Sequence, residues 1–340
     1  MKRGTASGVV LASMVAVVFG SCSGDDAPSQ PAHLSELADA PPQYHRVADW
    51  PRLPEGMEFG DMSGVDVDSH GQIIVIHRGD RGFAPETEDK IEEPVVVTLD
   101  AESGEVLQTW GADTFIVPHG LTVDQEDNVW ITDVGLHQVF KFTHDGELLL
   151  TVGEPRVSGW DENHFNRPTQ VVVLSDGSFY VADGYVNSRV AKFDASGNFL
   201  FEWGEAGNEA GQFNNPHGIT LDPDGNILVS DRENSRVQIF DLEGEFIREW
   251  WGAEPTGRVF SAAVGPDEYI YLAIRPQDRD VLRTGILKVD RNFEIVAQIG
   301  FSDTGDAVFN SAHYVAVGPD GAVYLAETPD RRVSKFVPLD

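Results

Sequence analysis

The sequence predicts an all-β protein, a six-bladed β-propeller. Three observations support this fold class. The 340 residues include 34 glycines and 19 prolines, which mark many turns and favour short strands over long helices. Apolar and polar residues alternate in short runs between turn sequences such as Asp-Gly, Ser-Gly and Pro-Asp-Gly. One pattern of four such runs returns six times along the chain, and repetition of this kind is typical of propellers.

The repeated unit is a meander of four short strands joined by tight turns. Its clearest copies open with Pro-His-Gly at residues 118–120 and 216–218, and a third opens at Pro168. A single meander cannot bury both of its faces, so the copies are expected to stack radially around a channel. We expect blades that start near residues 63, 118, 168, 216, 260 and 312.

Residues 44–340 contain all six copies, but the last copy has only three strands before the sequence ends. The stretch 44–50 can supply the missing outer strand. We therefore expect the two ends of the propeller to pair and to close the ring.

The first residues have the pattern of an export signal. A Lys-Arg pair precedes an apolar run at 9–19, which is too short to span a bilayer. The Phe-Gly-Ser-Cys sequence at 19–22 resembles a bacterial lipobox, in which the cysteine becomes the lipidated first residue. We expect a signal peptide at 1–22, lipidation at Cys22 and a flexible tether at 23–43. The domain is then exported and lipid-anchored at the cell envelope, periplasmic or outer surface; cleaved secretion is the alternative.

The charge of the chain restricts its partners. Lys and Arg number 24 against 56 Asp and Glu, a net charge of −32 with histidine neutral. Such a chain is repelled by polyphosphate, which excludes nucleic-acid binding by counterion release. We expect a monomer that meets a small molecule or a peptide and touches a membrane only through its lipid. Cys22 is the single cysteine, so the propeller contains no disulfide.

A histidine recurs in every second copy. The opening position of the six copies reads Ser63, His119, Thr169, His217, Ser261 and His313. The first strand of each blade lines the channel, and alternate blades of six lie about 120° apart around it, so the three imidazoles can converge. Three histidines with an open fourth position are a ligand set of catalytic zinc. The alternative is three independent polar groups, each with its own hydrogen bond.

A second register lies thirteen residues further on, at the end of the second strand. It reads His77, Asp133, Asp183, Asp231, Arg275 and Glu327. Because the first two strands are antiparallel, the loops after this register should face the same end of the channel as the histidines. These loops carry Arg78, Tyr185 and Arg232. An arginine can hold a carboxylate with two hydrogen bonds, and a phenol near cations can act as a base.

Each member of this second register also has a structural interpretation. For the three aspartates we favour it: they cap turns and pair with Arg189 and Arg236 in the Asn-Ser-Arg segments. Support of the histidines is their alternative role. For Arg78 and Arg232 the alternative is a salt bridge between blades.

At these residues the sequence resembles a known enzyme family. The copies are similar to NHL repeats, and longer motifs resemble the peptidyl-α-hydroxyglycine α-amidating lyase domain from about residue 63 to the C-terminus. Among these motifs are His-Arg-Gly-Asp at 77–80, Pro-His-Gly-Leu at 118–121, Asp-Gly-Tyr-Val-Asn-Ser-Arg at 183–189 and Asp-Arg-Glu-Asn at 231–234.

The resemblance implies a reaction and a role for each residue. The family breaks the N–C bond of a C-terminal α-hydroxyglycine and releases an amide and glyoxylate. By resemblance, zinc is held by His119, His217 and His313, with Tyr185 as the base, Arg78 as the essential arginine and Arg232 as a further active-site arginine.

Two positions next to the last histidine depart from the family pattern. The methionine two residues before the last zinc histidine is Ser311 here, and the following aspartate, which helps bind a structural calcium, is Tyr314. Val65 and Leu121 match the positions whose carbonyls complete that calcium site. The resemblance therefore matches all three zinc ligands of the family, whereas the calcium site lacks its aspartate and calcium binding stays undecided.

Two other functions compete with the lyase. The first is a non-catalytic, surface-tethered NHL propeller that binds a protein or a glycan. The second is metal-assisted ester or lactone hydrolysis in a calcium-centred propeller, which favours carboxylate and asparagine ligands over three histidines.

Overall fold

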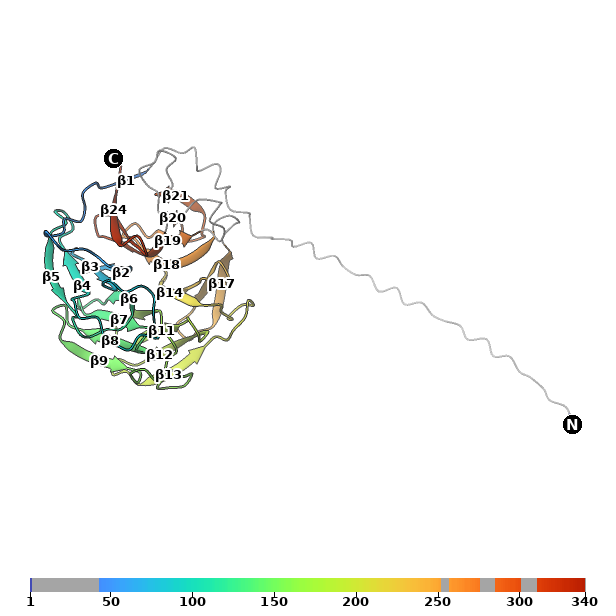
Figure 1. The fold of residues 1–340 in the computed structure, drawn as a ribbon. Helices are drawn as coiled ribbons and strands as arrows, with labels where there is room; N and C mark the ends of the chain where they lie inside the picture. Colours follow the sequence, from blue (N-terminus) through green and yellow to red (C-terminus); the bar gives the residue numbers. More distant parts are fainter. Residues whose placement is uncertain (2–42, 252–256, 276–284, 301–310, 340) are drawn as a thin grey trace. The chain divides into compact units, whose positions relative to one another are not determined.

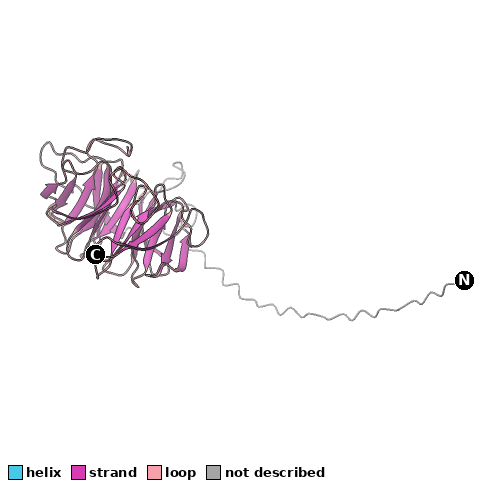
Figure 2. Ribbon diagram, turned by 90° about the horizontal axis from the view of Figure 1, so that it is seen from below, coloured by secondary structure: helices cyan, strands magenta, loops and turns pink. Residues whose placement is uncertain are grey.

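In a computed structural model, residues 43–251, 257–275, 285–300 and 311–339 are described, together with Met1. Six four-stranded antiparallel sheets surround a common centre, as predicted (Figure 1). The described residues contain strands and turns and no helix (Figure 2). The predicted signal peptide, tether and lipidation site at Cys22 lie outside them.

The strands of the first three blades follow the predicted order. Blade 1 contains β2 (Met62–Val67), β3 (Ile73–His77), β4 (Val96–Leu99) and β5 (Val106–Trp110). Blade 2 contains β6 (Pro118–Val123), β7 (Val129–Asp133), β8 (Gln138–Phe142) and β9 (Leu148–Val152). Blade 3 contains β10 (Gln170–Val173), β11 (Phe179–Asp183), β12 (Arg189–Phe193) and β13 (Phe199–Trp203).

The remaining blades repeat this pattern. Blade 4 contains β14 (Pro216–Leu221), β15 (Ile227–Asp231), β16 (Arg236–Phe240) and β17 (Phe246–Trp251). Blade 5 contains β18 (Arg258–Val264), β19 (Ile270–Arg275), β20 (Gly285–Val289) and β21 (Ile295–Ile299). Blade 6 contains β22 (Ala312–Val317), β23 (Val323–Glu327), β24 (Arg332–Pro338) and β1 (Tyr44–Arg46).

Blade 6 is built from both ends of the propeller. β1 pairs antiparallel with β24, with Tyr44 opposite Pro338 and Arg46 opposite Phe336. The expected closure of the ring by the stretch that begins at residue 44 is confirmed.

The first hairpin of blades 1, 3, 4 and 6 turns on an aspartate and a glycine with positive φ, whereas Asp127 and Glu268 take the left-handed position in blades 2 and 5. In blade 1, Asp68 accepts hydrogen bonds from the backbone N–H groups of His70 and Gln72, and Gly71 has φ of 80°. Glycine tolerates this left-handed conformation without the Cβ clash that other residues meet. The Asp-Gly and Ser-Gly signals in the sequence thus mark real strand boundaries.

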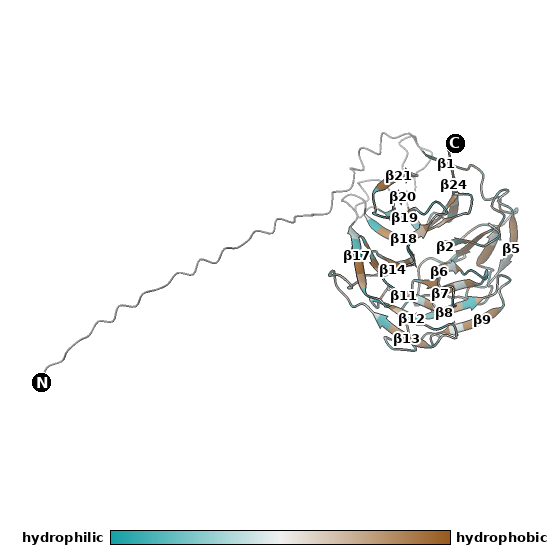
Figure 3. Cartoon of the chain, turned by 180° about the vertical axis from the view of Figure 1, so that it is seen from behind, coloured by the Kyte–Doolittle hydropathy of each residue, from teal (hydrophilic) through white to brown (hydrophobic). Residues whose placement is uncertain are grey.

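The core lies between neighbouring blades. Alternating apolar residues from both faces of each sheet are buried, and the hydrophobic residues concentrate on the strands (Figure 3). One cluster joins blades 1 and 2 around Phe115 and Ile131, and another joins blades 2 and 3 around Trp130 and Phe179. Packing between blades keeps the inner strands fixed around the channel.

The inner strands are irregular at each of the three histidines. The register of the first strand pair shifts between Pro118 and Leu121, between Pro216 and Gly218, and between Ala312 and Tyr314. A bulge of this kind redirects a side chain that regular pleating would send elsewhere.

No helix among the described residues has the length and apolar character needed to cross a membrane.

Candidate metal centre and active site

Three buried histidines meet at the centre of the propeller. His119, His217 and His313 lie on β6, β14 and β22, and their candidate ligand nitrogens all lie within 4.8 Å of one another. The ring centroids are 4.8 to 5.0 Å apart, and the ring planes are nearly perpendicular. Among the described residues this is the one cluster of three or more His, Cys, Asp or Glu side chains with metal-site spacing.

Backbone carbonyls of the odd-numbered blades orient the three rings. Nδ1 of His119 donates to the Thr169 carbonyl at 2.9 Å. The corresponding bonds run from His217 to the Phe260 carbonyl at 2.8 Å and from His313 to the Ser63 carbonyl at 2.9 Å. A carbonyl can only accept, so each Nδ1 carries the proton and each Nε2 is unprotonated, with a lone pair that can accept a hydrogen bond or bind a metal ion. Three neutral Nε2 ligands are the result.

Burial keeps these imidazoles neutral. Loss of hydration lowers the pKa of His119, His217 and His313 well below the usual range, and nearby positive charge lowers it further. For His119 this charge comes from Arg78, and for His217 from Arg232. Protons therefore compete weakly with a metal ion for the three nitrogens.

Tyr185 lies against the Nε2 face of the histidines. Its hydroxyl is 2.9 Å from Nε2 of His119 and 3.4 Å from Nε2 of His217. The Tyr185 ring packs on Phe83, with centroids 4.9 Å apart. The β11–β12 loop therefore brings the predicted base to the predicted metal ligands.

Arg78 is held at the same end of the channel. Its Nε donates to the Pro118 carbonyl, next to His119, at 3.1 Å, and its side chain is buried at 2% exposure. Its Nη2 is buried without a hydrogen-bond partner. An unpaired buried guanidinium nitrogen is costly and indicates a site for an anionic group.

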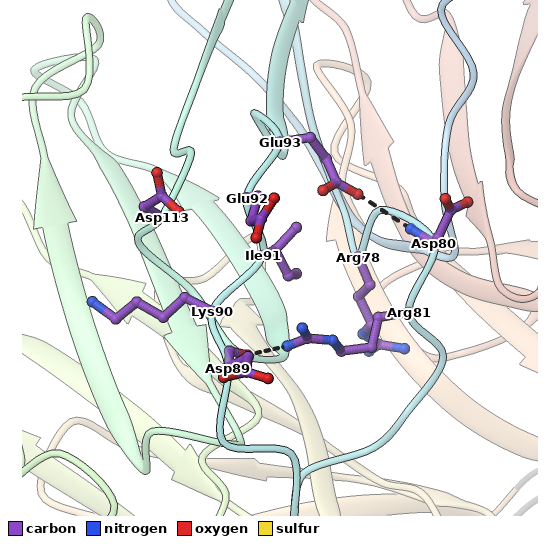
Figure 4. A pocket seen from close by; sticks show the side chains of 9 residues that line it. All are labelled: Arg78, Asp80, Arg81, Asp89, Lys90, Ile91, Glu92, Glu93 and Asp113. Atoms are coloured by element: carbon purple, nitrogen blue, oxygen red, sulfur yellow. Dashed lines mark hydrogen bonds between the residues drawn. The ribbon is translucent and has the colours of Figure 1, made fainter.

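Arg78 also lines a charged pocket of about 690 Å³ beside the β3–β4 loop (Figure 4). Its other lining residues are Asp80, Arg81, Asp89, Lys90, Ile91, Glu92, Glu93 and Asp113. Nη1 of Arg81 donates to the carbonyls of Asp89 and Ile116, which ties the loop to the start of blade 2. Arg78 thus connects the metal centre to an open, solvent-facing pocket.

Arg232 and Arg275 place further positive charge around the centre. Nη1 of Arg232 lies 3.5 Å from the Tyr185 hydroxyl, and its Nε pairs with Glu233 at 2.9 Å. The two guanidinium groups lie over the ring of Phe260, at 5.0 Å for Arg232 and 4.2 Å for Arg275. Arg275 also donates to the Ser311 carbonyl, two residues before His313.

The acidic residues of the second register have the structural role that we favoured. Asp183 pairs with Arg189 at 3.0 Å and Asp231 with Arg236 at 2.7 Å, and all four side chains are fully buried. Asp133 accepts bonds from four backbone N–H groups, those of residues 116, 117, 135 and 136. The alternative of carboxylate support for the histidines is wrong, because carbonyls orient the rings.

Tyr314 replaces the calcium-binding aspartate with a neutral hydroxyl. Its side chain is 1% exposed, and burial raises its pKa well above the usual range. The hydroxyl lies 3.1 Å from the carbonyls of Thr169 and His217. The substituted side chain supplies no negative charge for a calcium ion at this position.

Sequence reasoning did not assign Phe83, Phe260 or the three carbonyls. Phe83 could have been noticed as an aromatic residue five positions after Arg78 in a long loop. The carbonyls have no side-chain signal, but they belong to the small opening residues Ser63 and Thr169 and to Phe260, which precedes Ser261.

Comparison with known proteins agrees with the repeat analysis. The NHL repeat model matches residues 115–142, 165–193 and 213–240, which contain the three inner strands of blades 2, 3 and 4. A gluconolactonase structure from Xanthomonas campestris matches with a TM-score of 0.60 at 13% identity, over 91% of this chain and 94% of that one. This likeness concerns the fold alone.

Several relatives of higher identity have the names of enzymes. A probable peptidyl-alpha-hydroxyglycine alpha-amidating lyase of Caenorhabditis elegans is 33% identical over 81% of this chain and 82% of its own length. Peptidyl-glycine alpha-amidating monooxygenase A of Xenopus laevis is 33% identical over 89% of this chain. The match spans only about a third, 34%, of that longer relative.

The fold and the site together define an NHL-repeat propeller with a buried three-histidine centre. Sequence identity to the relatives named above shows the family to which this propeller belongs. The chain belongs to the peptidyl-α-hydroxyglycine α-amidating lyase family.

Proposed function

We propose that this protein is a zinc-dependent lyase that cleaves the N–C bond of a peptidyl- or N-acyl-α-hydroxyglycine, or a closely related hemiaminal. The products are an amide and glyoxylate. The observation that carries this proposal is the convergence of three buried histidines, with the Tyr185 hydroxyl at Nε2 of two of them, His119 and His217.

The residues fit a zinc ion. Three neutral imidazole nitrogens with an open fourth position are a ligand set of catalytic zinc, and the Nδ1–carbonyl bonds fix the tautomer that such a site requires. His119, His217 and His313 would hold the ion. When bound, zinc supplies a Lewis acid that lowers the pKa of the substrate hydroxyl.

The side chains around the histidines supply the remaining chemistry. In its phenolate form, Tyr185 takes the proton of the substrate hydroxyl; the C–N bond then breaks while the C=O bond of glyoxylate forms, and the same proton passes from Tyr185 to the amide nitrogen, which restores the phenolate. Atoms and charge balance, because one proton moves from oxygen to nitrogen. Arg232, 3.5 Å from the Tyr185 oxygen, stabilises negative charge on it.

Arg78 is suited to bind the substrate carboxylate. The buried, unpaired Nη2 offers a hydrogen bond that no described residue accepts. A guanidinium binds a planar carboxylate well, and the same contact holds the glyoxylate that forms. The hydroxyl-bearing carbon is thereby oriented toward Tyr185.

The test is release of glyoxylate from a model N-acyl-α-hydroxyglycine. We expect release that stops after treatment with a chelator, returns with zinc and is lost in His217→Ala. His164→Ala is the matched control, because His164 binds Asp161 and Glu154 near the surface and should keep full activity. No zinc-dependent release above buffer would exclude the α-hydroxyglycine substrate.

The same preparation separates the competing functions. Stoichiometric zinc without any release favours a related hemiaminal substrate. Calcium without zinc favours ester or lactone hydrolysis. Absence of a stoichiometric metal, with ligand binding unchanged when His119, His217 and His313 are all alanine, favours a binding propeller.

We also propose that the protein is exported and lipid-anchored through Cys22, and that it acts as a monomer. The support is the basic start, the short apolar run and the lipobox-like sequence at 19–22. Radiolabelled palmitate incorporation into the wild-type chain, and its loss in Cys22→Ser, is the expected result. Labelling that persists in Cys22→Ser would overturn the anchor.

A further inference from the structure

Tyr314 occupies a channel position that mostly small residues fill in the other blades. The residues that follow the opening position are Gly64, Gly120, Gln170, Gly218, Ala262 and Tyr314. A Cβ atom on Gly120 would lie 2.2 Å from the Thr169 carbonyl oxygen, and one on Gly218 would lie 2.8 Å from Cα of Ser261. The inner strands therefore approach too closely in blades 2 and 4 to admit a side chain there. Blade 6 places a phenol at the same level.

The Tyr314 side chain spans the channel. It starts on β22 in blade 6, and its hydroxyl lies 3.1 Å from the carbonyls of Thr169 in blade 3 and His217 in blade 4. Blades 3 and 6 face each other across a six-bladed ring, so a contact between them crosses the axis. The hydroxyl has one proton, and both carbonyls accept from it.

The ring of Tyr314 touches all three histidines. It stacks on His217 with an interplanar angle of 27° and meets His119 and His313 edge-on at 78° and 85°. The hydroxyl lies 3.5 Å from Nδ1 of His119, whereas the Tyr185 hydroxyl lies at Nε2 of the same ring. The two tyrosines thus lie at opposite nitrogens of one imidazole.

We propose that Tyr314 is a positioning residue of the metal centre, which ties blades 3, 4 and 6 together and holds the three Nε2 atoms toward one point. Its hydroxyl shares the Thr169 carbonyl with His119 and binds the backbone of His217 directly. Loss of this hydroxyl removes one hydrogen bond to the Thr169 carbonyl, the acceptor of His119, and one to the backbone carbonyl of His217. In the wild-type protein, Tyr185 and Arg78 lie on the open side of the metal site, and the ring of Tyr314 closes the opposite side.

The inference rests on the metal centre of the proposed function, and zinc affinity tests it. Tyr314→Phe keeps the ring and removes the hydroxyl. The matched control is Tyr180→Phe, because Tyr180 is also fully buried and donates to a carbonyl, that of Leu242, at 2.7 Å, in a place remote from the histidines. Each full-length variant is stripped of metal and titrated with zinc against a chromophoric chelator. Its melting temperature is recorded with and without zinc.

We expect Tyr314→Phe to bind zinc about 10-fold more weakly than wild type, the range found when groups that orient metal ligands are lost. Tyr180→Phe should bind zinc like wild type. The metal-free melting temperature should fall by a similar amount in Tyr180→Phe and in Tyr314→Phe, because each variant loses one buried hydrogen bond. Equal zinc affinity of Tyr314→Phe and wild type, or equal weakening in both variants, would overturn the inference. A wild-type chain that binds no zinc overturns it together with the proposed function, whereas tight zinc binding without glyoxylate release excludes the α-hydroxyglycine substrate and leaves the inference standing.

Discussion

Tyr185 donates its hydroxyl hydrogen to Nε2 of His119, at 2.9 Å. The direction of this bond follows from the other side of the ring, where Nδ1 of His119 donates to the Thr169 carbonyl and so leaves Nε2 as the acceptor. The hydroxyl and a metal ion therefore compete for one lone pair. A metal ion held by His119 would displace this hydrogen bond and leave the Tyr185 oxygen available to the substrate of the proposed reaction.

This competition predicts opposite effects of Tyr185→Phe on binding and on catalysis. The variant removes the competing donor, so its zinc affinity should equal or exceed that of wild type. Glyoxylate release should fall at least about 100-fold, as expected for loss of a general base. Chelator competition and steady-state kinetics measure the two effects. A variant that loses zinc and activity together would indicate that Tyr185 is a ligand rather than a base.

Arg78→Lys should not be a conservative change. A lysine keeps the charge but lacks the planar fork, and it cannot both reach the Pro118 carbonyl and present a second nitrogen to a carboxylate. We expect kcat/KM to fall roughly 100-fold, the size typical of misplaced substrate. Arg331→Lys is the control, because Arg331 lies nearby but is half exposed and pairs with Asp61 and Asp80. Equal kinetics of the two variants would remove Arg78 from the substrate site.

Acid should destabilise the metal-free protein through its buried histidines. Burial lowers the pKa of His217 well below the unfolded value of about 6.5. Below pH 6.5 the unfolded chain gains a proton that the folded chain does not, so stability falls as the pH falls. The effect is up to about 1.4 kcal/mol per pH unit for each such histidine.

Comparison with His217→Gln isolates the contribution of His217 to the pH dependence of the unfolding free energy, because the buried carboxylates titrate in both proteins. Urea unfolding of both chains with chelator present, between pH 7 and pH 5, should show a shallower loss of stability in the variant. Parallel curves would show that His217 titrates normally in the folded protein.

The buried pair of Asp183 and Arg189 should matter for folding and not for metal binding. Asp183→Ala leaves the fully buried guanidinium without its carboxylate, which costs about 3–5 kcal/mol of unfolding free energy. Glu86→Ala, which breaks the exposed pair with Arg167, should cost at most about 1 kcal/mol. Urea denaturation measures both. A large loss of zinc affinity by folded Asp183→Ala would instead assign the carboxylate to the metal centre.

The repeat pattern was sufficient to predict the fold and the convergence of three side chains. Blade number follows from counting copies, and radial stacking then fixes where equivalent positions lie. His119, His217 and His313 occupy one register in alternate blades, so their meeting at the axis follows from symmetry alone. The pairing of β1 with β24 follows from a missing strand in the last copy.

Other features of the site depend on backbone geometry that no residue type encodes. The bulges at the histidines and the carbonyls that orient them are main-chain properties. The sequence marked Tyr314 as a departure from the family, but its reach from blade 6 to blade 3 depends on channel width, which is set by how closely the glycine-bearing strands pack.

The shared construction of blade 6 has a consequence for biosynthesis. Residues 44–46 are made before any other strand, yet their partner at 332–338 is made last. Five sheets can be completed without either end of the propeller, and β1 has no strand to pair with until β24 is available. A stalled or C-terminally clipped product therefore lacks the strand that closes the ring, and we expect its open β-edge to make it prone to aggregation and proteolysis.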